Sequence, residues 1–389
     1  MPASAMSRRS LVVAGLSTIV EWYDFTLYLY LATLLSRIFS VGGDAGLTQI
    51  LAGFALAYAM RPFGAIVFGH IGDRYGRRVT MLASMTLMSL AMLATALLPT
   101  HAQAGPVAGW MLLGLRCLMA FSVGGEYTGV VAYLVEGAPV HRRGFVTSLA
   151  SAASEIGALL AAGISALTVA LLDEASLMDW GWRIPFFVGA AMAAVILLAR
   201  TSMEESPDFR RQAEGGTVPA SPLRHSLRHH RLPILRGFAI SALGSITYYV
   251  GITYVPAFLT GVGHMGEGVA LWLSTLAALA AILLPVPMFL SMLHGPGLAL
   301  AGALILAGLG GAVSAVGAVA TAEQFPGEGR LTGLALGATA ATAIFGGLTP
   351  WLSHLLIERT GWPLIPGALI ALVALVVLPI FARMPETKP

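Results

Sequence analysis

Long apolar runs separated by short polar turns follow one another along this 389-residue chain. A helix needs about twenty consecutive apolar residues to cross the hydrocarbon core of a bilayer. Many of the runs reach that length, and the charged residues fall almost entirely between them. The pattern therefore predicts an all-α protein that crosses a membrane many times.

The composition supports this prediction. Hydrophobic residues make up 57% of the chain and charged residues 11%, whereas a soluble domain has about 45–50% apolar and about 25% charged residues. The formal net charge is only +3, and we expect no nucleic-acid partner. The first apolar run follows Arg8 and Arg9 and is too long for a cleaved signal peptide, so we expect it to be the first span.

Arginine sets the orientation of the spans. Arginines gather before the first run, after the second, after the fourth and in the polar segment 201–231, whereas the alternate turns carry few cations. Because Lys and Arg near span ends are retained in the cytoplasm, the basic turns are predicted to be cytoplasmic. We expect about eleven spans of sufficient length, at residues 11–39, 46–71, 79–99, 107–135, 144–172, 183–200, 232–260, 267–291, 297–322, 329–356 and 362–382.

The polar segment 201–231 divides the chain. We expect a six-helix bundle over 1–200, a cytoplasmic linker over 201–231 and a second, shortened bundle over 232–389. A polar linker at the midpoint of a chain with many apolar runs suggests two bundles related by a repeat. The region 267–322 has room for two ordinary spans, so either the C-terminal end lies outside or this region holds three short or re-entrant segments.

Two carboxylates lie inside the first span. Glu21 and Asp24 are three residues apart on one helix face, roughly 15–20 Å from the cytoplasmic end at ~1.5 Å per residue. A charge at that depth costs ~2.5–3.5 kcal/mol or more. These carboxylates suit a proton carrier in a polar cavity, although a structural hydrogen bond is the alternative for each.

Arg116 lies in the fourth run, near the middle of the membrane, and needs an anion there. That anion is either a first-span carboxylate at similar depth or the carboxylate of a substrate, which the guanidinium fork would bind well. We also place Tyr28, Glu126, Tyr248 and Tyr249 among the substrate-binding candidates. Glu155, in the fifth run, is either a further proton site or a satisfied structural carboxyl.

A dense charged turn follows the second run. Gly69, Asp73, Arg74, Gly76, Arg77 and Arg78 form it, and Glu136, Arg142 and Arg143 cluster after the fourth run. Glycines let two helix ends approach closely, and Asp73 can accept hydrogen bonds from an arginine or a helix N-terminus. We interpret these residues as a cytoplasmic gate, with a basic loop that only sets topology as the alternative.

The turn G-x-x-G-D-R-Y-G-R-R resembles the loop between the second and third helices of the major facilitator superfamily. In that family the loop latches the two halves of a transporter on the cytoplasmic side. The segments EWYDF (21–25), RPFG (61–64), SVGGEYTG (122–129), EGAPVHRRG (136–144), GWRIPF (181–186) and FGGLTP (345–350) are similar to the metabolite:proton symporter family. Its members move citrate, dicarboxylates, shikimate, proline or betaine together with protons.

No phosphate-binding loop, metal cluster or nucleophile–base set stands out, and the single cysteine, Cys117, excludes a disulfide within the chain. We therefore expect neither an enzyme nor a cofactor or metal. The resemblance implies a monomeric proton-coupled symporter of a small organic acid in the bacterial inner membrane, working by alternating access. The alternatives are a carrier of a zwitterionic osmolyte such as proline or betaine, and a non-transporting sensor or decayed homologue.

Overall fold

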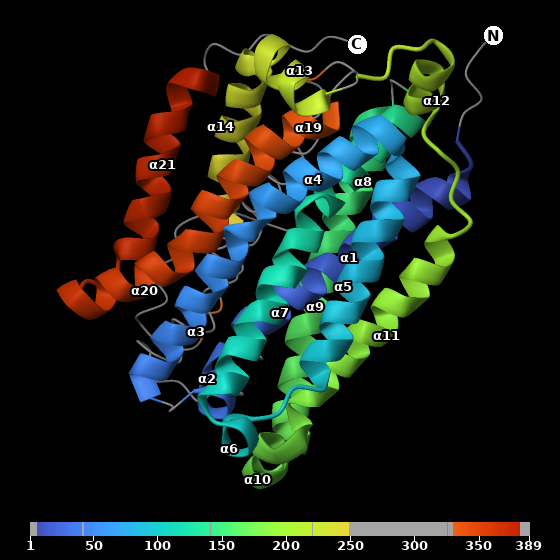
Figure 1. Cartoon of the computed structure of the whole chain (residues 1–389). Helices are drawn as coiled ribbons and strands as arrows, with labels where there is room; N and C mark the ends of the chain where they lie inside the picture. Colours follow the sequence, from blue (N-terminus) through green and yellow to red (C-terminus); the bar gives the residue numbers. More distant parts are fainter. Residues whose placement is uncertain are drawn as a thin grey trace.

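The computed structural model describes residues 6–40, 43–139, 142–219, 221–248 and 330–381, together with the single positions 297, 300 and 325. All regular structure in these residues is helical. Figure 1 shows the long helices lying roughly alongside one another, with short helices at both ends. The all-α prediction is therefore confirmed for the part of the chain that is described.

Three long stretches of the first half are each built from two consecutive helices. They are α1 (Arg8–Tyr30) with α2 (Ala32–Phe39), α3 (Gly43–Tyr58) with α4 (Met60–Tyr75), and α7 (Pro106–Gly124) with α8 (Glu126–Gly137). The remaining long helices of this half are α5 (Arg77–Ala96), α9 (Arg143–Leu171) and α11 (Arg183–Arg200). Together these helices enclose a large apolar core, and we call them the first bundle.

Short helices occupy the two ends of the first bundle (Figure 1). At one end lie α6 (His101–Ala104), α10 (Glu174–Ser176) and the π-helical turn η2 (Leu177–Gly181). At the other end lie the linker helices α12 (Pro207–Glu214) and α13 (Pro222–His229). The arginine-rich turn at Gly76 is at this second end, because Arg77 and Arg78 contact Glu205 in the linker. The segment 201–231, expected to be a polar linker, thus contains two helices.

The described helices of the second half are α14 (Arg231–Tyr248), α19 (Arg330–Leu334), the π-helical segments η4 (Ala335–Thr339) and η5 (Thr342–Leu348), α20 (Thr349–Thr360) and α21 (Ile365–Phe381). α14 packs against η4, η5 and α21 around a small apolar core. Among the described residues, six helices have the length and hydropathy needed to cross a membrane. The expected spans 267–291 and 297–322, and with them the expected count of eleven, fall outside the described residues.

A tight crossing of α4 and α7 sets the rotation of two helices that carry candidate residues. A Cβ added at Gly64 would lie 1.8 Å from the Phe121 carbonyl oxygen, and one at Gly124 would lie 2.1 Å from the Arg61 carbonyl oxygen. Only glycine allows two helix backbones to approach this closely. The crossing brings the α4 backbone at Arg61 directly against α7, the helix that carries Arg116.

Candidate functional site

Asp24 on α1 and Arg116 on α7 form an ion pair inside the first bundle. The Arg116 Nη1 atom lies 2.7 Å from Asp24 Oδ2, and Arg116 Nη2 donates a hydrogen bond of 2.8 Å to Thr95 Oγ1. The two side chains are 5% and 0% exposed. A buried ion pair offsets its desolvation cost only with good geometry and further hydrogen bonds, and this pair has both.

In the part of the chain that is described, each member of the pair keeps one polar atom without a partner. Within the described residues, Asp24 Oδ1 and Arg116 Nε have no hydrogen-bond partner. Aromatic faces lie beside the cation, because the Arg116 guanidinium carbon is 5.6 Å from the ring centre of Tyr28 and 5.9 Å from that of Phe186. Tyr28 stacks on Phe54 with ring centres 5.9 Å apart. Cations are attracted to such ring faces, so Tyr28 lies where a bound cation would meet it.

Glu21 pairs with a different arginine, Arg61 on α4. The Arg61 Nη2 atom lies 2.5 Å from Glu21 Oε1, with the side chains 6% and 1% exposed. Our sequence analysis did not include Arg61 among the candidates. The available signal was an arginine in the middle of an apolar run, where a cation requires an anion.

The Glu126 carboxylate already has an arginine and a serine as partners within the first bundle. Its carboxylate pairs with Arg200 of α11 and accepts a hydrogen bond of 2.6 Å from Ser84 of α5. Arg200 also donates to Ser17 of α1 at 2.5 Å, and its side chain is fully buried. This cluster joins four helices of one bundle, so we do not carry Glu126 into the proposed substrate site.

Three further candidates are placed less fully. Glu155 lies on α9 and is half-buried. Tyr248 is the last residue of α14, and Tyr249 lies outside the described residues. The roles of all three remain predictions.

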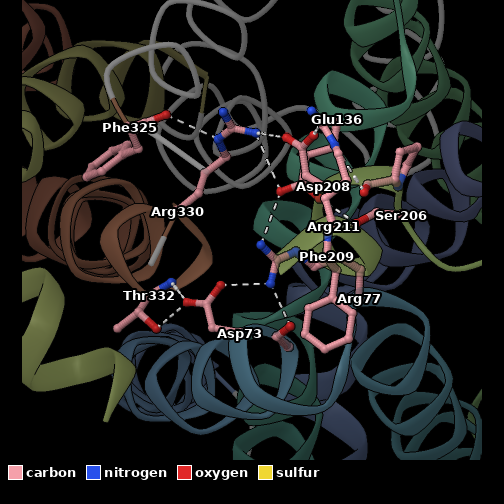
Figure 2. Close-up of polar contacts among 12 residues, drawn as sticks. Asp73, Arg77, Glu136, Ser206, Asp208, Phe209, Arg211, Phe325, Arg330 and Thr332 are labelled. Atoms are coloured by element: carbon pink, nitrogen blue, oxygen red, sulfur yellow. Dashed lines mark hydrogen bonds and ion pairs between the residues drawn. The ribbon is translucent and has the colours of Figure 1, made fainter. Parts of the chain in front are cut away.

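A second cluster joins the first bundle to α19 at the linker end. Arg77 pairs with Asp73 at 2.8 Å and with Glu136 at 3.1 Å. Asp73 Oδ2 accepts hydrogen bonds from the Thr332 backbone N–H and hydroxyl, at 3.0 and 2.7 Å. Arg330 Nη1 lies 3.4 Å from Glu136 Oε1. Figure 2 shows Arg77 between Asp73 and Glu136, with Thr332 and Arg330 approaching from α19.

The linker contributes to the same cluster. Ser206 donates a hydrogen bond of 2.6 Å to Glu136 Oε2, and Asp208 Oδ2 lies 3.5 Å from Arg330 Nη1. Every carboxylate in the cluster therefore faces an arginine or a hydrogen-bond donor. We call the seven residues that make these contacts the cytoplasmic latch: Asp73, Arg77, Glu136, Ser206, Asp208, Arg330 and Thr332.

Gly76 lets the linker approach the start of α5. Its φ of +112° lies in the region that favours glycine, and an added Cβ would lie 2.2 Å from Glu205 Oε2. Glu205 Oε1 accepts the backbone N–H of Arg77 at 2.9 Å and, with Oε2, that of Arg78 at 3.3 and 3.2 Å. An anion stabilises a helix N-terminus. Burial raises the pKa of the Glu205 carboxyl, and these N–H groups oppose that rise.

The predicted gate residues do not all enter the latch. Gly69 lies against α19, because an added Cβ would be 3.3 Å from Thr332 Cα. Arg78 donates a hydrogen bond of 2.7 Å to the Thr201 carbonyl, and the exposed Arg74 lies over the Tyr75 ring at 5.7 Å. Arg142 and Arg143 form no ion pair in the part of the chain that is described.

The sequence reasoning missed the linker and α19 contributions to this end of the protein. A signal for the linker was present in its acidic start, with Glu204, Glu205 and Asp208 directly after the sixth apolar run. Thr332 gave none, because it is an uncharged residue in an ordinary short segment, Arg-Leu-Thr-Gly (330–333). Contacts of this kind depend on segments that are far apart in the chain.

Comparisons with known proteins place this geometry in context. The family model described as "Sugar (and other) transporter" matches residues 10–220. The Escherichia coli proline/betaine transporter is 29% identical over 98% of this chain and 84% of its own length. The Escherichia coli alpha-ketoglutarate permease is 30% identical over 91% and 88%, and an inner membrane metabolite transport protein of Escherichia coli is 33% identical over 72% and 66%.

Among solved structures, a proton:xylose symporter of the major facilitator superfamily, bound to 6-bromo-6-deoxy-D-glucose, superposes with a TM-score of 0.75. The match covers 98% of this chain and 96% of the symporter, at 19% identity. At this level of identity the similarity concerns the fold, and it extends over nearly the full length of both chains.

Proposed function

Because the chain belongs to the sugar (and other) transporter family, in the metabolite:proton symporter branch of the major facilitator superfamily, we propose that it carries a small zwitterionic osmolyte together with protons. It is a multi-pass transporter of the bacterial inner membrane, like its relatives, and not an enzyme. The proposed substrates are of the proline and betaine type, with one carboxylate and one ammonium group.

The Asp24–Arg116 pair is the observation that carries the proposal. Its two charges are buried and lie 2.7 Å apart, and each group keeps one polar atom without a partner among the described residues. A zwitterion offers a carboxylate to Arg116 and carries its own ammonium group, so it adds no net charge to the buried site. A dicarboxylate would instead add two negative charges beside Asp24, and uncompensated buried charge is costly.

The aromatic rings beside Arg116 support the same class of substrate. Tyr28 and Phe186 present ring faces at 5.6 and 5.9 Å from the guanidinium carbon, and Tyr28 stacks on Phe54. Ring faces bind quaternary ammonium groups without requiring a hydrogen-bond donor from the ligand. We therefore keep Tyr28 as a proposed substrate-binding residue, whose ring would contact the ammonium group of the substrate.

Asp24 is the proposed coupling carboxylate. In the structure, Asp24 is paired with Arg116 at 2.7 Å. When a substrate carboxylate competes for Arg116, Asp24 loses its partner and takes up a proton, while the substrate ammonium group lies against the Tyr28 ring. Binding shifts the balance between inward-open and outward-open states only as far as substrate and proton prefer one of them.

The cytoplasmic latch is the proposed inner gate. Its contacts to Thr332 and Arg330 join the first bundle to α19, so they break when the two halves separate at this end. Closing and opening of the latch would then alternate access to the Asp24–Arg116 site.

A small organic acid is the second candidate substrate, favoured by the alpha-ketoglutarate permease among the relatives. In that case Arg116 binds a substrate carboxylate while Asp24 is protonated. The two candidates differ in whether the substrate carries a positive group of its own.

Uptake into proteoliposomes tests the proposal. Purified protein is reconstituted, and accumulation of radiolabelled proline, betaine and alpha-ketoglutarate is measured with and without an imposed pH gradient. We expect proline and betaine to accumulate only with the gradient, and the variant Arg9→Gln, which changes an exposed arginine, to behave like the unmodified chain. Equal accumulation without the gradient would exclude proton coupling, and accumulation of alpha-ketoglutarate alone would replace the osmolyte by an organic acid.

A further inference from the structure

The Glu21–Arg61 pair lies one helical turn from Asp24 but makes different contacts. Both side chains are buried, and the bond between Arg61 Nη2 and Glu21 Oε1 is 2.5 Å. Within the described residues, the second oxygen of Glu21 has no hydrogen-bond partner. The proposed transport cycle assigns no step to this pair, although a buried carboxylate in a membrane span is a functional candidate by default.

Arg61 is held by two aromatic rings. Its guanidinium carbon lies 4.3 Å from the ring centre of Phe25 on α1 and 4.6 Å from that of Tyr58 on α3. Arg61 Nη1 also donates a hydrogen bond to the Tyr58 hydroxyl. Tyr58 is completely buried, so its position determines where the guanidinium group can lie.

Tyr58 is also the point where the first bundle meets η5. A Cβ added at Gly347 would lie 2.3 Å from Tyr58 Cβ and 2.5 Å from Tyr58 Cγ. The η5 backbone at Gly347 therefore packs directly against Cβ and Cγ of Tyr58. The contact is separate from the cytoplasmic latch, because about 25 Å of helix lies between Tyr58 and the end of α4 at Tyr75.

The segment that makes this contact has unusual helix geometry. Residues Ala335–Thr339 and Thr342–Leu348 are π-helical, within a single span that continues into α20. Such segments are rare and frequently occur at functional sites. Here the second π-helical segment places Gly347 against Tyr58.

Charged groups from several helices act on Glu21. Arg61 acts from α4, Glu126 from α8 and Arg200 from α11, while Asp24 lies on Glu21's own helix. Glu126 and Arg200 neutralise each other as an ion pair, and Asp24 is neutralised by Arg116. Arg61 is therefore the cation on which an ionised Glu21 depends.

We propose that Tyr58 and Arg61 are positioning residues that make the ionisation of Glu21 depend on the contact between the two halves of the protein. While η5 lies on Tyr58, the tyrosine holds Arg61 against Glu21. When the halves separate, Tyr58 and Arg61 move and Glu21 takes a proton from water. Protonation of Glu21 thus favours the open state. The inference uses the alternating-access cycle of the proposed function, but it does not depend on the identity of the substrate.

Spin-label distances across the cytoplasmic end test this directly. Cys117→Ser removes the native thiol, and Tyr75→Cys and Leu232→Cys place labels on exposed positions of α4 and α14. Distances are measured by double electron–electron resonance between pH 5 and 8, without substrate. We expect longer distances as the pH falls, long distances at every pH in Glu21→Gln, and a preserved pH response in Asp24→Asn.

The outcomes separate this inference from the proposed function. A pH response that persists in Glu21→Gln, or that disappears in Asp24→Asn alone, would overturn the role of Glu21 and leave Asp24 as the proton site for transport. Failure of proton-driven uptake with an intact Glu21 response would instead overturn the proposed function alone.

Two further variants test the positioning residues. Tyr58→Phe keeps the ring and removes the hydroxyl, so Arg61 is held less firmly and the midpoint of the distance change should move to higher pH, with betaine affinity unchanged. Gly347→Ala should lengthen the distances at neutral pH, whereas Gly114→Ala, whose Cβ meets open space, should not. An unchanged midpoint in Tyr58→Phe, with Gly347→Ala indistinguishable from Gly114→Ala, would refute the proposal.

Discussion

The substitution Thr332→Val tests whether the cytoplasmic latch controls the inner gate. Valine has almost the same shape as threonine but cannot donate the hydrogen bond of 2.7 Å from Thr332 Oγ1 to Asp73 Oδ2. The backbone bond of 3.0 Å from Thr332 to the same oxygen remains. A hydrogen bond to a charged group contributes about 1.5–3 kcal/mol. Because this bond joins the two halves only while the gate is closed, its loss should favour the open state by about 10- to 150-fold.

The gate equilibrium is measured with the same spin-label pair at Tyr75 and Leu232. We expect Thr332→Val to increase the fraction of molecules with a long distance between the labels. The melting temperature should stay close to that of the unmodified chain, because the lost bond joins the two halves and does not hold either half together. Thr86→Val is the matched control, since Thr86 is exposed and its hydroxyl donates a hydrogen bond to the Leu82 carbonyl of its own helix. A ratio of open to closed states within twofold of the control would refute the latch as the gate.

Three further substitutions test other parts of the structure. Asp24→Asn removes the proposed coupling carboxylate, so uptake driven by a pH gradient should disappear while exchange of internal for external betaine persists; gradient-driven accumulation in this variant would contradict the assignment. Glu126→Gln leaves a buried arginine without its anion and should lower the free energy of unfolding by about 3–5 kcal/mol with little change in betaine affinity, whereas lost affinity at normal stability would return Glu126 to the substrate site. Gly76→Ala should destabilise the protein by more than about 1 kcal/mol because of its positive φ and its contact with Glu205, and a melting temperature equal to that of Gly114→Ala would contradict this.

The arrangement of charges shows how far sequence reasoning reaches. An arginine or carboxylate inside an apolar run must find a partner or a cavity, so Asp24 and Arg116 were recognisable as a possible pair. Glu21 was recognisable as a functional candidate and Arg61 as a buried cation that needs an anion, but nothing in the local sequence joined the two. The partners are 40 residues apart for Glu21 and Arg61, 92 for Asp24 and Arg116, and 74 for Glu126 and Arg200.

The latch shows the same limit. The sequence predicted that Asp73, Arg77 and Glu136 would act together at a cytoplasmic gate, and the structure brings them into contact. Thr332 and Arg330 join them from 259 and 194 residues away. Nothing in the local sequence indicates which helix of the second half will face the first bundle at this position.

The sequence by itself determined the helices, because a backbone in lipid must satisfy its own hydrogen bonds along apolar runs of sufficient length, and it predicted which turns are cytoplasmic from the distribution of arginine. Only the tertiary structure decided which arginine pairs with which buried carboxylate. That choice depends on the rotation and crossing of each helix, which are fixed here by contacts such as those at Gly64 and Gly124. Several arginines could have neutralised each carboxylate at similar depth, and only the packing of whole helices selected one.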